Sequence, residues 1–343
     1  MTATMHDTLE AETAIQIANL SKVFRGSHRD EAVRAVDDLT VSFATGQVHG
    51  LLGRNGAGKS TLMKLITAQL FASSGQVRVF GEPPLENPTV LSRTCFIQES
   101  QTYPDHLTPG QLFSVAAGLY PHWDSGYAQN LISQFDLPTN RRIKKLSRGQ
   151  LSTVGIILGL ASRAELTMFD EPYLGLDPVA RVAFFDLLLA DLGEHPRTVV
   201  LSTHHIDEAA DLLENIVVLD HGRLLLADDA ESLRAGAYTL SGRTSDVDDL
   251  TRGRPVIQRH SLGPVATATV HQPLTRADRA QAEQRGVEIS PVSLQSLFIH
   301  LISDSDPGRA ATNSGSTEAA AAHLAQESPD TSTHPNALNG GPR

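Results

Sequence analysis

The chain has 343 residues and a mass of 36.9 kDa, enough for one large domain or two ordinary ones with a core that needs no cross-links. Its 28 Lys and Arg against 39 Asp and Glu give a formal net charge of -11, which disfavours attraction of the whole molecule to nucleic acid or anionic lipid. The single cysteine, Cys95, excludes an internal disulfide framework and a multi-cysteine zinc site, as expected of a protein from a reducing compartment.

The first 14 residues have an acidic character and no apolar run, so neither a signal peptide nor a transit peptide is expected there. We expect residues 1–13 to be flexible. The longest apolar stretches, such as 154–161, are far shorter than the roughly 20 residues of a membrane-spanning helix. Any role at a membrane would therefore require a partner protein.

Short apolar runs alternate with helical patterns as far as about residue 220, which predicts an α/β core. The run Thr198-Val199-Val200-Leu201 is apolar without alternation, as in strands that are buried on both faces of a parallel sheet. Strands are predicted at residues 14–20, 39–43, 47–52, 76–80, 94–98, 166–170 and 198–202. Helices are predicted at residues 59–70, 147–161, 179–192 and 207–213.

The segment 104–142 has a helical pattern and lies between two predicted sheet strands. We therefore expect a helical subdomain, over about residues 100–160, inserted into a domain that spans 14–235. Two apolar runs around a Gly-containing turn predict a hairpin over 216–226 that closes this domain.

The sequence changes in character after residue 235, where glycines interrupt weaker strand patterns. A strand over 265–271, a helix from Thr275 with a capping pair to Asp278, a strand over 287–291 and a helix over 293–302 predict a small mixed domain at 236–302. From residue 303 to 343 the chain is rich in Ser, Thr, Ala, Asn, Gly and Pro, which predicts a disordered tail.

The segment Gly53-Arg54-Asn55-Gly56-Ala57-Gly58-Lys59-Ser60 matches the P-loop pattern between a predicted strand and a predicted helix. Glycines let backbone N–H groups face phosphate oxygens, while the Lys reaches the β- and γ-phosphates and the Ser hydroxyl can bind Mg²⁺. A turn that binds nothing would not explain Lys and Ser at the start of the helix. The candidate nucleotide-binding residues here are Gly53, Asn55, Gly56, Ala57, Gly58, Lys59, Ser60 and Thr61.

A second element is the apolar strand 166–170, which ends in the acids Asp170 and Glu171. Asp170 can hold Mg²⁺, and Glu171 can orient or deprotonate an attacking water. Two acids at a strand end are often only the start of a solvated loop. The P-loop, however, lies at a carboxyl end too, and open α/β sheets bind ligands at that edge.

A third element, Leu146-Ser147-Arg148-Gly149-Gln150, is both a capping box formed by Ser147 and Gln150 and a candidate anion site. With the P-loop and the acid pair, it resembles the signature sequence of the ATP-binding subunits of ABC transporters. The resemblance covers about residues 15–228. Two segments, 158–164 and 170–177, are similar in sequence to the type-2 antibiotic and peptide exporter subgroup of this family.

The resemblance implies roles for individual residues. Ser147, Gly149 and Gln150 would face the γ-phosphate of a nucleotide held by the opposite subunit of a dimer. Arg148 stands where the family usually has glycine.

Four further positions match the family pattern in order. Gln98 resembles the glutamine that contacts magnesium and the attacking water, and Asp177 resembles the D-loop residue at the dimer interface. His204 resembles the H-loop histidine that contacts the γ-phosphate. Phe24 lies where the family stacks an aromatic ring on adenine, although core packing is an alternative role for it.

The resemblance implies an α/β P-loop NTPase with a RecA-like core, an inserted helical subdomain and a small mixed α/β C-terminal domain. The implied function is ATP hydrolysis with Mg²⁺ in a homodimer or heterodimer that powers a separate membrane permease from the cytoplasmic face, most readily as an exporter of a peptide, antibiotic or lipid-like substrate. The permease contact would involve the region after Gln98, unless its side chains are ordinary core: Tyr103, Pro104, Leu107, Phe113, Tyr120 and Trp123.

Two alternatives belong to other classes. A soluble ABC-type ATPase acting on nucleic acid or ribosomes is disfavoured by the acidic charge and by the single nucleotide-binding module, so no nucleic-acid partner is expected. A catalytically silent subunit would follow if Arg148 weakened its composite site, but the presence of Lys59, Glu171 and His204 argues against silence.

Overall fold

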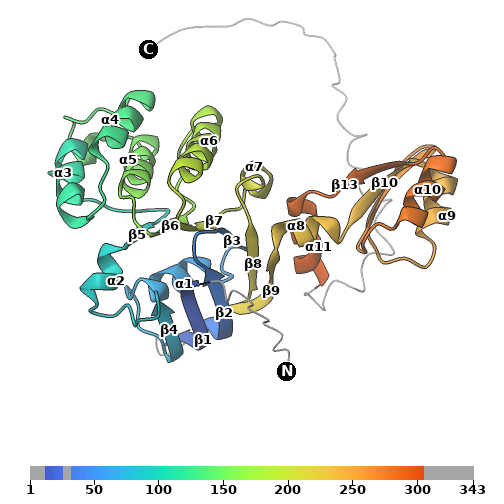
Figure 1. Cartoon of the computed structure of the whole chain (residues 1–343), viewed down its shortest axis with the longest axis horizontal. Helices are drawn as coiled ribbons and strands as arrows, with labels where there is room; N and C mark the ends of the chain where they lie inside the picture. Colours follow the sequence, from blue (N-terminus) through green and yellow to red (C-terminus); the bar gives the residue numbers. More distant parts are fainter. Residues whose placement is uncertain (1–11, 26–31, 305–343) are drawn as a thin grey trace, which may run out of the picture. The chain divides into compact units, whose positions relative to one another are not determined.

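The computed structural model describes residues 12–25 and 32–304 (Figure 1). The first strand begins at Thr13 and the last helix ends at Asp304. The predicted flexible N-terminus and disordered tail therefore overlap the described part by two residues each and otherwise lie outside it.

A six-stranded sheet in the order β5-β6-β7-β3-β8-β9 forms the centre of the fold. All pairs from β5 to β8 are parallel, whereas β9 is antiparallel to β8 and forms the expected hairpin. The residues of β3, β5, β6 and β7 are all buried, which confirms the prediction from their unbroken apolar runs. The strands are β3 (Val48–Gly53), β5 (Thr94–Ile97), β6 (Leu166–Asp170), β7 (Thr198–Ser202), β8 (Asn215–Asp220) and β9 (Arg223–Asp229).

A separate antiparallel sheet has the order β2-β1-β4, with β1 (Thr13–Phe24), β2 (Val33–Ala44) and β4 (Ser74–Val79). The sequence did not predict this separate sheet, and it gave β1 and β2 as 14–20 and 39–43, well short of their full length. Both strands continue beyond their buried residues into a ladder where Phe24 pairs with Val33. There, hydrogen bonding to the partner strand rather than burial defines the strand, so the sequence shows no apolar pattern from which the strand could be predicted.

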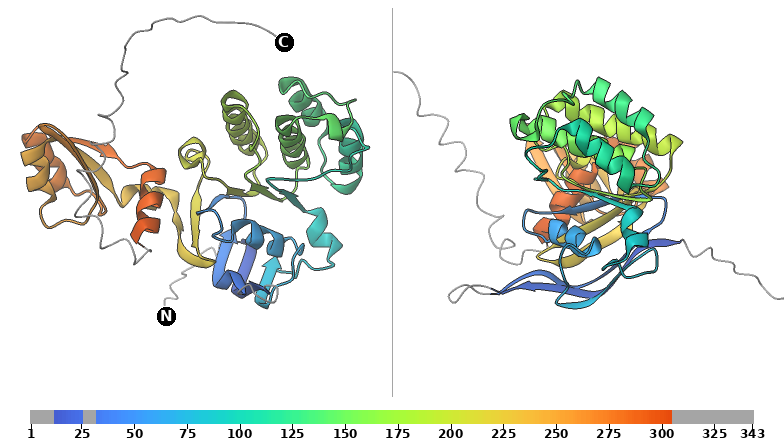
Figure 2. Two further views of the ribbon diagram at one scale, coloured as in Figure 1. Left: turned by 180° about the vertical axis from the view of Figure 1, so that it is seen from behind. Right: turned by 90° about the vertical axis from the view of Figure 1, so that its left-hand side faces the viewer.

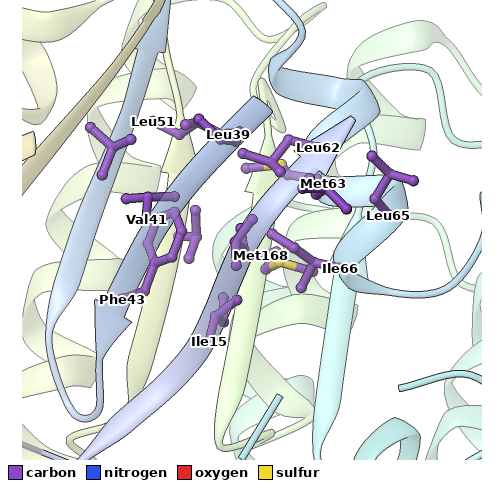
Figure 3. Close-up of a cluster of buried hydrophobic side chains, with 14 of the residues drawn as sticks. Ile15, Leu39, Val41, Phe43, Leu51, Leu62, Met63, Leu65, Ile66 and Met168 are labelled. Carbon is purple, nitrogen blue, oxygen red and sulfur yellow. The ribbon is translucent and has the colours of Figure 1, made fainter. Parts of the chain in front are cut away.

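Helix α1 (Lys59–Ile66) lies between the two sheets. Its Leu62, Met63 and Ile66 belong to one buried cluster with side chains of β1 and β2 and with Leu51 and Met168 of the central sheet (Figure 3). The helix ends before the predicted residue 70, because the backbone turns into the left-handed region at Ala68. Packing on both faces fixes the helix whose first turn carries the P-loop lysine.

Helices α5 (Arg148–Ala161) and α6 (Pro178–Glu194) cover the opposite face of the central sheet (Figure 1). Gly159 of α5 packs so closely on Phe169 of β6 that an added Cβ would lie 2.4 Å from the ring. The ring of Phe184 in α6 meets the same Phe169 edge-on at 5.6 Å between centroids.

The inserted helical segment lies between β5 and β6, as predicted from the sequence. It comprises α3 (Pro109–Leu119), α4 (Ser125–Gln134) and the 3-10 turn η1 (Ile143–Lys145), and it continues into α5 (Figure 2). Phe113 and Trp123 stack on each other at 6.2 Å between ring centroids within this segment. Three short helices complete this part of the chain: α2 (Pro88–Ser92), α7 (Ile206–Ala209), which is shorter than the predicted 207–213, and α8 (Ala230–Ala235).

The C-terminal part contains an antiparallel sheet of order β11-β12-β10-β13 with its own core around Leu240, Val247 and Ala268. Thr275 caps α10 with Asp278 in a capping box, as predicted. Helix α9 was not predicted, since Val247 and Leu250 are its only large apolar side chains. The elements are β10 (Tyr238–Arg243), α9 (Thr244–Thr251), β11 (Val256–Leu262), β12 (Val265–Val270), α10 (Arg276–Gln284), β13 (Glu288–Pro291) and α11 (Leu294–Asp304). No helix of the described residues is long and apolar enough to span a membrane.

Candidate nucleotide-hydrolysing site

The register of the parallel strands brings the sequence-predicted residues to one edge of the central sheet. Asp170 pairs with Ser202, and Ser202 also pairs with Leu51 near the end of β3. The pair Ile97–Phe169 places Gln98 beside Asp170. The P-loop, the acid pair, Gln98 and His204 thus all follow the carboxyl ends of adjacent strands, where open α/β sheets bind ligands.

The P-loop backbone requires glycine at the residue that caps α1. Gly58 has φ 102°, and an added Cβ would lie 2.2 Å from the carbonyl oxygen of Ala35. The hairpin turn between β8 and β9 supports the loop, because the Gly222 N–H donates to the Ala57 carbonyl at 3.0 Å. The hairpin therefore supports the P-loop by a hydrogen bond, and β2 lies close against Gly58.

Lys59 is buried at the first turn of α1, with 9% of its surface exposed. Its Nζ donates to the carbonyl oxygens of Gly53 at 2.7 Å and Arg54 at 3.3 Å. Burial lowers the pKa of the ammonium, while the negative charges of Glu171 and Asp170 oppose this shift. The structure thus brings the P-loop lysine into the field of both acids.

Asp170 fits a role as a magnesium ligand. It is 3% exposed, and among the described residues its carboxylate takes part in no hydrogen bond, although it faces the charge of Lys59. A carboxylate together with the Ser60 hydroxyl is the oxygen set that Mg²⁺ prefers. The residues present therefore fit the metal.

Glu171 and His204 are in direct contact. Nδ1 of His204 lies 2.8 Å from Oε2 of Glu171, and because a carboxylate can only accept, Nδ1 carries the proton. Glu171 is 7% exposed, while the His204 side chain is half exposed. The half-exposed ring thereby keeps its other nitrogen, Nε2, free of this contact.

Gln98 is not joined to the acids by a hydrogen bond among the described residues. Its side-chain amide donates to Oε1 of Gln69 at 3.1 Å, and its backbone N–H donates to Gln101. A pocket of about 480 Å³ lies next to it, lined by residues 97–103, by residues of α5 such as Arg148, and by residues of the loop after β6 such as Gly175. Gln98 is thus at the expected edge, beside a pocket between β5 and α5, the helix that begins in the signature segment 146–150 and is called the signature helix below.

The signature segment starts α5 as a capping box. The Gln150 N–H donates to the Ser147 hydroxyl at 3.2 Å, and the Ser147 N–H donates to Oε1 of Gln150 at 3.0 Å. Gly149 touches the segment 175–177, which leads into α6 of the same chain, so closely that an added Cβ would lie 2.7 Å from the Gly175 carbonyl oxygen. The glycine at 149 is therefore required by this contact within one subunit, apart from any role towards nucleotide.

The remaining two candidates lie at exposed positions. Asp177 caps α6 by accepting from the Ala180 N–H at 2.9 Å. Phe24 is 40% exposed at the end of β1, with the Lys22 ammonium 5.1 Å from its ring centroid. Its exposure rules out core packing as its role.

Sequence reasoning missed the contacts of Tyr173 and Thr203 with this site. The Tyr173 hydroxyl lies within hydrogen-bonding distance of both Oε2 of Glu171 and the Thr203 hydroxyl. Its spacing of two residues from Glu171 was the only available signal, since the strand register that brings Thr203 alongside is a tertiary feature.

These features define a P-loop domain built to hydrolyse a nucleoside triphosphate. Residues 36–174 match the family model described as ABC transporter, so this part of the chain is similar to an ABC transporter ATP-binding domain.

Comparison with known proteins gives relatives with similar sequence identity to this chain. The daunorubicin/doxorubicin resistance ATP-binding protein DrrA of Streptomyces peucetius is 29% identical over 84% of this chain and 92% of its own length. The glycine betaine uptake system ATP-binding protein YehX of Escherichia coli is 29% identical over 83% and 90%. A dimeric post-hydrolysis structure of the ATP-binding cassette MJ0796 bound to ADP and Pi superposes with a TM-score of 0.55 at 22% identity, covering 63% of this chain and 98% of that chain.

Proposed function

We propose that the chain is the ATP-hydrolysing subunit of an ABC exporter, with the P-loop, Asp170, Glu171 and His204 as the hydrolytic centre. Lys59 and the backbone N–H groups of residues 53–61 hold the β- and γ-phosphates, and Phe24 stacks on the adenine. Ser60, Asp170 and Gln98 would hold Mg²⁺, which would supply charge neutralisation at the phosphates.

Glu171 acts as the general base in this proposal. Its Oε2 is engaged by His204, so Oε1 is the atom that accepts a proton from the attacking water. Nε2 of His204 contacts the γ-phosphate. Lys59 stabilises the charge that develops on the phosphoryl oxygens.

A second ATP-binding subunit completes the site. Ser147, Gly149 and Gln150 of one subunit face the γ-phosphate held by the other, and Asp177 lies at the interface between them. The exposed N-terminus of α5 supports this, because a capped helix start attracts anions. The partner is a second copy or a related ATP-binding subunit.

The dimer drives a separate membrane permease from the cytoplasmic face of the membrane. The pocket between residues 97–103 and α5 is the expected binding site for the permease, since it lies next to Gln98. Of the side chains after Gln98 that the family resemblance implicates in that contact, Phe113 and Trp123 stack on each other within the helical segment. Export of a peptide, antibiotic or lipid-like substrate is proposed on the likeness to the resistance protein, although the likeness to an uptake protein makes direction a point to test.

The proposed division of the chain is an ATP-binding domain at 14–235, with a helical subdomain at about 100–160, and an accessory domain at 236–302. The separate sheet and separate core of the C-terminal part support it. The alternative of a soluble ATPase acting on nucleic acid or ribosomes has no feature of the site in its favour.

The observation that carries the proposal is the convergence of Lys59, Asp170, Glu171 and His204 at one sheet edge. Glu171→Gln tests it, because the amide keeps the shape of the side chain and removes the base. We expect ATP to bind normally, hydrolysis to fall by about 100-fold or more, and ATP with Mg²⁺ to trap a dimer in size-exclusion chromatography. Glu194→Gln, an exposed acid at the end of α6, is the matched control and should hydrolyse ATP like the wild type.

Adding Ser147→Arg to Glu171→Gln should prevent the trapped dimer, since the bulky cation fills the space at the start of α5. The proposal fails if Glu171→Gln hydrolyses ATP at the wild-type rate, or if it stays monomeric with ATP bound both alone and mixed with its partner ATP-binding subunit. Equal dimerisation of the double variant would remove the signature helix from the interface. Transport direction is tested with inside-out vesicles that contain the co-purified permease.

A further inference from the structure

Tyr173 is the one buried hydroxyl among the described residues that contacts the proposed general base. The residue is 2% exposed, and its hydroxyl reaches both Oε2 of Glu171 and the Thr203 hydroxyl. These contacts join the strand ends of β6 and β7, which carry the acid pair and His204. No role assigned so far to the site explains this hydroxyl.

The direction of each hydrogen bond follows from the acceptor. A carboxylate can only accept, so the Tyr173 O–H donates to Glu171, and Thr203 donates its own proton to the Tyr173 oxygen. The Thr203 oxygen is in turn fixed by the backbone N–H of His205, which donates to it at 3.0 Å. The chain of donors therefore runs from the backbone after β7 to Oε2 of Glu171.

The ring of Tyr173 is fixed by aromatic packing, which keeps its hydroxyl next to Glu171. It packs against Phe185 and Phe184 of α6, with centroids 5.5 and 6.3 Å apart. The ring also contacts His205 and His204, with centroids 5.5 and 6.1 Å away. Burial and the adjacent Glu171 charge raise the pKa of the phenol, so Tyr173 stays protonated as a donor.

We infer that Tyr173 is a positioning residue for hydrolysis, which holds Oε2 of Glu171 together with His204 and leaves Oε1 to receive the proton of the attacking water. The inference rests on the proposed function. Two donors on one oxygen fix the torsion of the carboxylate. His204 by itself would hold Glu171 less firmly, because its side chain is half exposed and also has to reach the γ-phosphate. Tyr173 therefore gives Oε2 a second donor that is buried and does not depend on His204.

Tyr173→Phe tests the hydroxyl without removing the ring. Because the variant acts on the base and not on nucleotide contacts, we expect kcat for ATP to fall about 5- to 30-fold while KM stays within about twofold. Tyr127→Phe is the matched control: this tyrosine lies on α4 with its ring 4.4 Å from the guanidinium of Arg163, and its variant should keep both constants. A purely structural role for Tyr173 would lower the melting temperature without this split.

The Glu171→Gln background separates the positioning role from a general defect. If Tyr173 works through the carboxylate, adding Tyr173→Phe to Glu171→Gln should change the residual rate by less than about twofold. Thr203→Val breaks the next link and should lower kcat by a smaller factor, again at constant KM; it also serves as the test if Tyr173→Phe does not fold.

The inference is overturned if Tyr173→Phe keeps the wild-type kcat, if KM rises while kcat holds, or if its effect is undiminished in the Glu171→Gln background. Its failure is distinct from that of the proposed function. Full activity of Glu171→Gln would refute the general base itself, whereas full activity of Tyr173→Phe beside an inactive Glu171→Gln refutes only the positioning role.

Discussion

The P-loop and the corner formed by Glu171, Tyr173 and His204 lie at the same sheet edge but are built in different ways. The P-loop is one continuous segment whose geometry is set by backbone, with Gly58 in a left-handed conformation against Ala35. The corner is made of side chains from two strand ends that meet only in the folded chain. The geometry of the P-loop is thus determined by local sequence, whereas that of the corner depends on tertiary structure.

The difference predicts how each half fails. A continuous loop with few conformational options should lose function abruptly when a single atom intrudes. A side-chain network with two donors on one carboxylate oxygen should lose function in steps as donors are removed. The following variants test this contrast.

Lys59→Ala should have the largest effect. Removing the ammonium removes charge stabilisation at the β- and γ-phosphates and the hydrogen bond to the Gly53 carbonyl oxygen, whereas the Arg54 carbonyl oxygen still accepts from the Ala57 N–H. We expect hydrolysis to fall by about 1,000-fold, at the upper end for loss of one preorganised donor. A phosphate-release assay measures this, with Lys64→Ala at the other end of α1 as the control. Wild-type turnover of Lys59→Ala would refute the P-loop assignment.

Gly58→Ala tests whether the backbone of the loop is as constrained as its geometry indicates. The added Cβ would meet the Ala35 carbonyl oxygen at 2.2 Å and would sit at φ 102°. Strain of about 1–3 kcal/mol is expected, which corresponds to a loss of roughly 5- to 150-fold in ATP affinity if binding restores the native loop. Calorimetric titration with ATP measures it, and Gly118→Ala on α3, where an added Cβ meets nothing within 4 Å, should leave affinity unchanged.

The same contrast explains what could be predicted from the sequence. The P-loop, the acid pair, the hairpin at 216–226 and the Thr275 cap were recognised because each is a short segment whose residues interact with one another. β6 and β7 match their predicted bounds, since unbroken apolar runs mark strands that are buried on both faces.

The antiparallel sheet of β1, β2 and β4 was not predicted, because outer pairs such as Phe24 with Val33 are held by backbone pairing between exposed residues that carry no apolar pattern. α9 was missed for lack of an apolar stripe, and the end of α1 was misplaced because Ala68, a strong helix former, adopts a left-handed conformation. The role of the Tyr173 hydroxyl could not be predicted either, because its partner Thr203 is 30 residues away in sequence and meets it only in the folded chain.

His204→Ala should show the stepwise loss expected of the corner. Glu171 keeps its Tyr173 donor, so the base stays partly oriented while the contact to the γ-phosphate is lost. We expect kcat to fall about 10- to 100-fold with ATP affinity within about threefold. His122→Ala, on the loop before α4, is a control that should not change either quantity. A loss of affinity as large as that of Gly58→Ala would show that the two halves of the site are not distinct.

Arg148→Gly should have the smallest effect, and its sign decides what the departure from the family pattern means. Arg148 is exposed at the first position of α5, and its guanidinium makes no hydrogen bond or ion pair with any described residue. Its removal therefore leaves nothing unpaired in the single subunit, and glycine at a helix start costs less than about 1 kcal/mol.

The variant removes a long cation beside Ser147, where the opposite subunit would present its γ-phosphate. If the side chain is only tolerated there, hydrolysis should be equal or up to about threefold faster; a specific duty predicts a loss of about tenfold, equivalent to ~1.4 kcal/mol. We expect the former. Arg148→Gln separates charge from length, because it keeps most of the side chain without the cation. A tenfold loss in both variants, with melting temperatures unchanged, would instead make Arg148 a phosphate contact in trans and would turn the departure from glycine into a working part of the composite site.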